Sequence, residues 1–424
     1  MKITSDVFEA YLKCPTKCWL RATDEPSAGN TYSEWVKAQN ASYRLSATRR
    51  LVAEFPNNEV ALSPDMKNFK AAKWRLACSL AVQAQMDSCT LESELHALER
   101  VPAEGRIKPT QFIPIRFVFT NKLSKDDKLL LAFDASALSK SLGREVRIGR
   151  IVHGDEQTTL KVKTSAMSSD VRKRGERIPT LLSNPGSPDL VLNPHCPECE
   201  FQARCRHKAV EKDDLSLLSN MSAKDRKKFH SKGIFTITQL SYTFRARRRP
   251  KRLGGKREKY HHSLKALAIR EKKIHIVGSP ELKLEGTPVY LDVEGLPDRD
   301  FYYLIGLRIG NGESAVQHSL WADSIEDEVK IWRDFLTILE TIENPILIHY
   351  GSYETTFIRH MHERYGEPQG NSSAAKALHS CLNLLTVIFT QFYFPTFSNG
   401  LKDVASSIGY RWTDAVSSGL ESIA

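Results

Sequence analysis

Three cysteines lie within ten residues of one another in the stretch HCPECEFQARC. Cys196 and Cys199 form a Cys-x2-Cys pair, and Cys205 follows after five more residues. Thiolates at this spacing bind zinc or an iron–sulfur cluster, and a closed site of either kind needs four ligands. The spacing therefore predicts a metal site whose fourth ligand lies elsewhere in the chain.

A second group of residues with chemical potential lies in the C-terminal third. Asp292 and Glu294, in the strand-like stretch YLDVEG, are two residues apart, so both side chains are expected on one face. The apolar flanks predict that this strand is buried on both sides, where two acids repel each other unless a cation holds them. Glu354 opens the helical pattern YETTFIRHMHERY. Carboxylates grouped in this way indicate two-metal phosphoryl transfer, and the alternative is a solvated strand end beside Gly295.

The net charge of +11 is concentrated in one segment. Between Arg245 and Lys273 there are 13 Lys and Arg residues against two acids. Such a run is either a solvated linker or a tether that binds phosphates with strong salt dependence. The residues that we expect to contact nucleic acid here are Arg245, Arg247, Arg248, Arg249, Lys251 and Arg252.

Length and composition limit the possible classes of protein. A chain of 424 residues predicts two or three domains, and 41% hydrophobic with 26% charged residues is typical of globular proteins. Neither an apolar run of membrane-spanning length nor a signal-peptide core is visible, so we expect a cytoplasmic protein without membrane contact. In that compartment, eight cysteines favour metal binding over disulfides.

The elements that position these residues alternate between helical and strand-like patterns. In the N-terminal half we expect helices over 4–22, 69–86 and 125–143, the last ending at Gly143. Strands are expected over 90–102 and 111–120, and a hairpin over 146–164. Residues 213–241 contain two short helical patterns around Gly233, which indicate either a helix-hairpin-helix element or a plain two-helix linker.

From residue 287 the pattern is three strands, a helix, a strand and a helix, which is the order of a ribonuclease H-like fold. Tyr353-Glu354, YYLIGL and FPTFSNGLKDVASSIGYRW strengthen this likeness. Residues 286–424 thus resemble the ribonuclease H-like, DEDD exonuclease-type domain found behind RecB-like nuclease domains. The resemblance implies that Asp292, Glu294 and Glu354 are catalytic and hold Mg²⁺ or Mn²⁺.

Two departures from that family concern its remaining ligands. Asn383, in SCLNLL, stands where the family commonly has the Asp of an Asp-Leu-Leu segment. The family also continues past SGLESIA to a segment with the last carboxylate, so we expect a C-terminally incomplete domain. Asp403 and Asp414 are alternative ligands, although the first fits a helix surface and the second a turn.

The fourth cysteine ligand follows from a second resemblance. Cys14 on the first predicted helix, together with the three clustered cysteines, resembles the iron–sulfur RecB-like exonucleases of the PD-(D/E)XK class. That class holds a [4Fe-4S] cluster with four thiolates, here Cys14, Cys196, Cys199 and Cys205. Zinc is the chemical alternative. Cys18 is an alternative fourth ligand, and His195 and His207 are further candidates.

The nuclease residues of that class are missing between the cysteines. The class has Pro-x-Glu-x-Lys where this chain has Pro114-Ile115-Arg116-Phe117-Val118, and an acid where this chain has His96. Arginine does not ligate Mg²⁺, so the resemblance implies an inactive site. We expect this domain to serve as a nucleic-acid-binding scaffold, with Arg116 contacting phosphate.

The sequence thus predicts an α/β protein with two main domains. The first is an N-terminal RecB-like, restriction-endonuclease-type domain with a metal site of four cysteines, and the second is a C-terminal ribonuclease H-like domain. The predicted function is metal-dependent nuclease action on DNA or RNA through the second domain. The alternative is a catalytically inactive nucleic-acid-binding protein. The predicted segments are 1–210 (RecB-like), 211–244 (helix-hairpin-helix-like), 245–285 (basic linker) and 286–424 (ribonuclease H-like).

Overall fold

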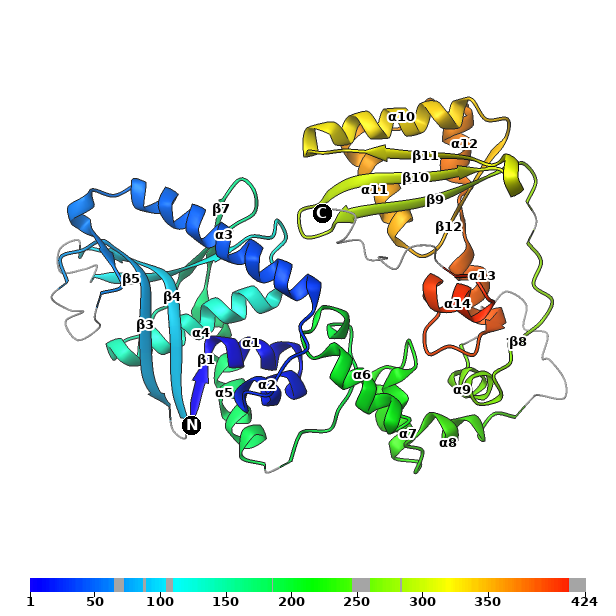
Figure 1. Ribbon diagram of the computed structural model, residues 1–424. Helices are drawn as coiled ribbons and strands as arrows, with labels where there is room; N and C mark the ends of the chain where they lie inside the picture. The colour runs from blue at the N-terminus through cyan, green and yellow to red at the C-terminus, as the bar shows by residue number, and fades with distance from the viewer. Residues whose placement is uncertain are drawn as a thin grey trace. The chain divides into compact units, whose positions relative to one another are not determined.

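The computed structural model describes residues 1–64, 72–86, 89–103, 110–184, 186–245, 260–282 and 284–411 (Figure 1). Contacts between Cα atoms divide the chain into two units, Met1–Arg206 and His207–Ala424. In the described residues, no helix is long and apolar enough to cross a membrane. The finer division of the chain into four segments, as expected from the sequence, remains a prediction.

The first unit is built on a seven-stranded sheet of mixed direction. Its strands follow the order β2-β3-β4-β5-β6-β7, and β1 pairs in parallel with β4. The predicted hairpin is confirmed as the antiparallel pair β6–β7. The strands are β1 (Lys2–Thr4), β2 (Val60–Leu62), β3 (Leu76–Met86), β4 (Cys89–Val101), β5 (Gln111–Val118), β6 (Gly149–His153) and β7 (Thr158–Val162).

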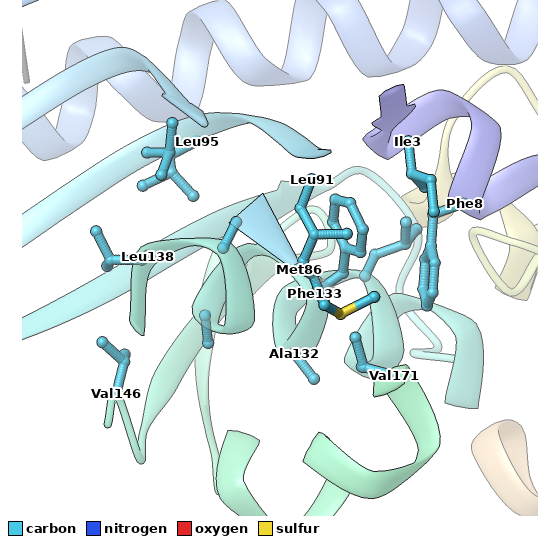
Figure 2. Close-up of a cluster of buried hydrophobic side chains, with 14 of the residues drawn as sticks. Ile3, Phe8, Met86, Leu91, Leu95, Ala132, Phe133, Leu138, Val146 and Val171 are labelled. Carbon is cyan, nitrogen blue, oxygen red and sulfur yellow. The ribbon is translucent and has the colours of Figure 1, made fainter. Parts of the chain in front are cut away.

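Helices cover both faces of this sheet (Figure 1). Ala47 of α3 packs on Cys78 and Ile115 on one face, whereas α1, α4 and α5 bury the opposite face. Phe8 of α1 stacks on Phe133 of α4 with ring centroids 4.6 Å apart, inside the cluster that Figure 2 shows. The helices are α1 (Ser5–Lys13), α2 (Pro15–Ala22), α3 (Thr31–Ala53), α4 (Lys125–Leu142), α5 (Ser168–Ser183) and α6 (Gln202–Glu211), which extends across the unit boundary.

Local signals explain the bounds of α4. Ser124 and Asp127 form a reciprocal capping box at its start, which satisfies backbone amides that lack helical partners. Gly143 ends the helix in the left-handed conformation with φ 68°, where glycine has no Cβ penalty. The predicted helix over 125–143 is confirmed.

The predicted helix over 69–86 is wrong, because its described C-terminal part is strand β3. Alanine and glutamine favour a helix, but Leu80, Val82 and Met86 are buried in alternation with exposed Ala81 and Gln83. Pairing with β4 along the whole strand, and with β2 at its start, overrides the intrinsic preference.

The single helix predicted over 4–22 is also wrong, since Cys14 separates two helices. Cys14 is extended, with φ −166° and ψ 131°, and Pro15 begins α2. Proline disfavours a helical conformation at the residue before it, which explains the break. Thr4 caps α1, since its side chain accepts a hydrogen bond from the Val7 amide.

The second unit contains a five-stranded sheet in the order β11-β10-β9-β12-β13. Strands β9, β10 and β11 are antiparallel neighbours, whereas β12 runs parallel to β9. The predicted succession of three strands, a helix, a strand and a helix is confirmed. These strands are β9 (Thr287–Leu296), β10 (Phe301–Ile309), β11 (Val316–Trp321), β12 (Pro345–His349) and β13 (Leu382–Asn383).

One face of this sheet carries the apolar core. Val289, Leu291 and Val293 of β9 pack in one cluster with residues of α10, α11 and α12. Because side chains alternate along a strand, the residues between them face the opposite side. The helices are α10 (Glu328–Glu340), α11 (Tyr353–Tyr365), α12 (Ser373–His379), α13 (Leu384–Gln391) and α14 (Leu401–Ser407).

The residues before this sheet are also folded. Helices α7 (Ala223–His230) and α8 (Ile237–Ser241) flank Gly233, and the buried Arg226 and Asp214 form an ion pair of 2.9 Å. The predicted linker segment contains α9 (His262–Glu271) and β8 (His275–Ile276). Strand β8 pairs with β14 (Phe392–Tyr393), and Leu264 of α9 packs on Tyr393.

Candidate functional site

The two acids of β9 lie side by side on the face opposite the apolar core. Asp292 pairs in register with Gly306 of β10, and Glu294 pairs with Leu304. Asp292 is exposed and Glu294 is half-buried. The structure thus confirms that both carboxylates share one face of β9. The prediction that β9 is buried on both sides is wrong, because the face that carries the acids is open to solvent at Asp292.

The third acid comes from the neighbouring parallel strand. Glu354 is the second residue of α11, which follows β12 after a short loop, and it is 5% exposed. A carboxylate in the first turn of a helix is stabilised by the helix dipole. Its Oε2 atom lies 3.4 Å from Nδ1 of His349, the last residue of β12, which is also buried.

These carboxylates act on one another electrostatically. Partial desolvation, followed by the charge of Glu354, raises the pKa of Asp292. Desolvation, followed by the charges of Asp292 and Glu354, raises the pKa of Glu294. Lys402 on α14 opposes both shifts. A site in which anions raise one another's pKa favours binding of a cation.

His349 supplies positive charge next to Glu354. Burial by itself lowers the pKa of an imidazole, but the side chains of Cys381 and Glu354 raise the pKa of His349 to about 9. The His349 imidazole therefore faces the Glu354 carboxylate as a cation. This histidine was missed in the sequence, although a histidine inside the apolar stretch PILIHY was a usable signal.

The Tyr353 side chain lies against the end of β9 because position 295 has no side chain. A Cβ atom at Gly295 would stand 2.6 Å from the Tyr353 hydroxyl oxygen and 2.6 Å from the carbonyl oxygen of Phe301. Burial and the charges and hydroxyls around it raise the pKa of Tyr353. The Tyr353-Glu354 pair is thus held beside the acids of β9.

The residues considered for the family's remaining ligand positions, Asn383, Asp403 and Asp414, lie in different places. Asn383 exchanges hydrogen bonds with the backbone of Gly351 and caps α13 through the amide of Leu385. Asp403 on α14 accepts a hydrogen bond from the Ser398 hydroxyl. Asp414 lies outside the described residues.

The four predicted thiol ligands line one pocket of the first unit. Cys14, at the α1–α2 break, lines it together with Cys196 and Cys199, which precede α6, and with Cys205, which lies within α6. Burial and the other three thiols raise the pKa of Cys205 to about 11. Residues 182 positions apart in the chain are therefore neighbours here.

Polar contacts hold the two ends of this pocket together. Glu200 is 5% exposed, and its carboxylate lies 2.9 Å from the Lys17 ammonium and 2.7 Å from the Arg21 guanidinium. Although burial opposes the shift, these two cations lower the pKa of Glu200 to about 2. Arg204 adds an ion pair of 2.6 Å with Glu25.

The alternative ligands differ in position. Cys18 is fully buried in the apolar core, where burial and Cys14 raise its pKa to about 12. His195 lines the pocket, and His207 pairs with Glu211 at 3.1 Å. Over the part of the chain that the structure describes, no three His, Cys, Asp or Glu side chains are grouped so that they could hold a metal ion.

The residues of the predicted inactive site form a buried network. Arg116 is 8% exposed, and its Nε atom lies 3.4 Å from Asp134 Oδ2. The Ser93 hydroxyl donates a hydrogen bond to Asp134 Oδ1 at 2.6 Å. His96 Nδ1 accepts a hydrogen bond from the Phe117 amide. Asp134 was missed in the sequence, although an acid within LLLAFDASAL was a signal. Burial raises the pKa of Asp134, and Arg116 opposes that shift.

Only the first residue of the basic segment that was predicted to bind phosphate, Arg245, lies within the described residues. Arg245 is exposed at the end of a described segment. Arg247, Arg248, Arg249, Lys251 and Arg252 lie outside the described residues.

Comparison with known proteins bears on the C-terminal residues. Residues 289–424 match the family model of the RNase_H superfamily. No curated protein matches the chain. The solved structure titled "Crystal structure of SSO0001" is similar at 12% identity and a TM-score of 0.30, covering 49% of this chain and 86% of that chain. The family model thus identifies residues 289–424 as a ribonuclease H-like domain of the RNase_H superfamily.

Proposed function

We propose that the ribonuclease H-like domain is a metal-dependent nuclease that hydrolyses phosphodiester bonds of DNA or RNA in the cytoplasm. The observation that carries this proposal is the electrostatic effect among the acids of a segment that matches this superfamily: Glu354 raises the pKa of Asp292, and Asp292 and Glu354 raise the pKa of Glu294. Oxygen ligands of this kind suit Mg²⁺ or Mn²⁺.

Each residue of this site has a distinct task in the proposal. Asp292 and Glu294 present carboxylates from a rigid central strand, and Glu354 adds a third from α11. His349 pairs with Glu354, and Gly295 lets Tyr353 approach the strand. A bound metal would supply activation of water and stabilisation of the leaving oxygen.

For the first unit we propose a RecB-like scaffold that binds nucleic acid. The thiols of Cys14, Cys196, Cys199 and Cys205 line one pocket and are the proposed ligands of a [4Fe-4S] cluster, with zinc as the alternative. The pairing of Arg116 with Asp134 supports an inactive centre, because the residue that stands where the class has an acid is an arginine engaged with a buried carboxylate. The same burial leaves little of Arg116 available to phosphate.

A catalytically inactive nucleic-acid-binding protein is the second candidate. It is favoured by Asn383, whose amide is engaged with the backbone of Gly351 at the position where the family has a carboxylate. The two candidates differ in one measurable property, which is cleavage.

The test uses purified protein, Mn²⁺ and end-labelled single- and double-stranded DNA and RNA. The nuclease proposal expects shortening of at least one substrate, abolished by Asp292→Ala and unaffected by Asp334→Ala, which removes an exposed acid from α10. Binding without cleavage, equal in both variants, would establish the second candidate instead.

A further inference from the structure

The face of the sheet that carries the acids continues from β9 across β10 to the edge strand β11 (Figure 1). Residues that pair directly opposite each other in an antiparallel sheet point to the same face. Through Leu304 of β10, Glu294 of β9 is in one row with Trp321 of β11. Two strand spacings place the Cα atom of Trp321 about 10 Å from that of Glu294. The tryptophan therefore stands on the same face as the carboxylates.

The neighbouring row of this face carries little side-chain bulk. It consists of Asp292, Gly306 and Ser319, so the position beside the aspartate has no side chain and the next has only a hydroxymethyl group. Ser319 is exposed. The two positions between Asp292 and the edge of the sheet thus leave room for a molecule that lies across β10 and β11.

The row on the other side of Asp292 supplies a cation. It consists of Tyr290, Arg308 and Gln317. Arg308 is exposed, and its Nη2 atom donates a hydrogen bond to the Gly312 carbonyl at 3.0 Å. A guanidinium carries five donors in a planar fork, which suits a phosphate contact. The open row is therefore flanked by an aromatic ring on one side and by a positive charge on the other.

The Trp321 ring is supported from one side and remains accessible. It stacks on the ring of Tyr303, with centroids 6.2 Å apart and 22° between the planes, and Tyr303 is 6% exposed. Trp321 itself is 52% exposed. A single exposed aromatic residue is ordinary on a protein surface. This one, however, shares a row with a carboxylate of the candidate site, and a ring held by a buried neighbour loses little side-chain freedom when it binds a flat partner.

We infer that Trp321 is a stacking platform for a base of single-stranded DNA or RNA whose backbone passes over Asp292, and that Arg308 contacts a phosphate of the same strand. The inference rests on the proposed nuclease function and assigns it a substrate class, the unpaired strand. In a duplex the bases are stacked inside the helix, so only an unpaired strand offers a base to the tryptophan. Because every base has a π-face, we expect little sequence preference.

The test measures binding of fluorescein-labelled oligo(dT) to the full chain, with Ca²⁺ in place of Mn²⁺. Trp321→Ala is expected to weaken binding on the order of tenfold or more, as removal of a stacking ring does. Trp321→Phe should retain most of the affinity, because it keeps a ring. Val316→Ala is the matched control, since Val316 lies on the same strand, is 53% exposed and points to the opposite face.

An abasic strand separates the contribution of the base from that of the backbone. An oligonucleotide of equal length without bases should bind wild type and Trp321→Ala with equal affinity, since the ring has no base to stack on. An equal loss of affinity for the abasic strand and for oligo(dT) would overturn the stacking role. If Trp321→Ala does not fold, Trp321→Leu takes its place, because leucine keeps an apolar contact with Tyr303 without offering a ring.

The phosphate contact has its own readout, which is the salt dependence of binding. Arg308→Gln should reduce the slope of log Kd against log salt by about 0.7, the value for one phosphate contact on a single strand. Trp321→Ala should leave this slope unchanged, because stacking releases no counterions. An unchanged slope in Arg308→Gln would overturn the phosphate contact, and a reduced slope in Trp321→Ala would overturn the stacking role.

Further outcomes separate this inference from the proposed function. If Trp321→Ala binds oligo(dT) as wild type does, while Asp292→Ala still abolishes cleavage, the platform fails and the nuclease stands. If binding depends on Trp321 but no substrate is cut in Mn²⁺, the nuclease proposal fails and the platform stands. A dimer in solution that is lost in Trp321→Ala, with unchanged oligo(dT) binding, would assign this face to a second copy of the chain and overturn the inference.

Discussion

Nδ1 of His349 lies 3.4 Å from Oε2 of Glu354, and both side chains are buried. The pKa of His349 is raised from 6.5 to about 9, so its proton stabilises the fold. This contribution is fully present below pH 6.5 and is lost as pH rises through about 9. In metal-free protein, His349→Gln should therefore lower the free energy of unfolding below pH 6.5 and have a smaller effect above pH 9.

The measurement for His349 is urea unfolding of the second unit, followed at both ends of that pH range in a chelator. His379→Gln, which removes an exposed histidine of α12, serves as the control and should show no such pH dependence. An equal loss of stability at both pH values for His349→Gln would contradict the ion pair.

Glu200→Gln should destabilise the first unit. The change leaves Lys17 and Arg21 without their shared carboxylate, which we expect to cost about 2 kcal/mol at neutral pH. The pKa of Glu200 is lowered from 4.5 to about 2, so the difference from wild type should persist above pH 4.5 and shrink as pH falls toward 2. Thermal unfolding measures it, and Glu198→Gln, an exposed neighbour, should have little effect.

Cys14→Ala should remove the metal or cluster and destabilise the whole first unit, because Cys14 joins the α1–α2 break to the distant cysteine segment. The measurement is iron, sulfide and zinc content of anaerobically purified protein, together with its colour. Brown protein containing iron and sulfide identifies the cluster, whereas colourless protein with zinc identifies the alternative. Cys18→Ala should keep the metal, since Cys18 lies in the apolar core. Loss of metal in Cys18→Ala but not in Cys14→Ala would reverse the ligand assignment.

Gly295→Ala should destabilise the second unit by roughly 1–3 kcal/mol, because its Cβ meets a backbone carbonyl as well as the Tyr353 hydroxyl. Gly306→Ala is the comparison, since a Cβ there stands 3.5 Å from its nearest neighbour, which is ordinary contact. Denaturant unfolding distinguishes the two, and equal effects would refute the close approach at Gly295.

The sequence predicted those parts of the structure that depend on local pattern. Alternation around Asp292 placed both acids of β9 on one face, and Gly143 marked the end of α4. Strand β3 was misread because alanine-rich composition favours a helix while pairing with β4 decides the outcome.

The remaining site residues depend on contacts between distant segments. Trp321 is in one row with Glu294 because β11 and β9 each pair with β10 in a particular register, and nothing near either residue in the sequence indicates that register. Likewise, the Arg116–Asp134 pair joins a strand to a helix, and only the packing of the two shows that the arginine faces an acid.

The central claim is that the three carboxylates cut nucleic acid with the help of a metal. The most direct measurement is the initial rate of cleavage of an end-labelled strand at increasing Mn²⁺, for wild type and for Asp292→Asn. We predict a rate that saturates with Mn²⁺ in wild type and falls by a factor on the order of a thousand in Asp292→Asn. Equal rates in the two proteins, or cleavage that persists in a chelator, would contradict the claim.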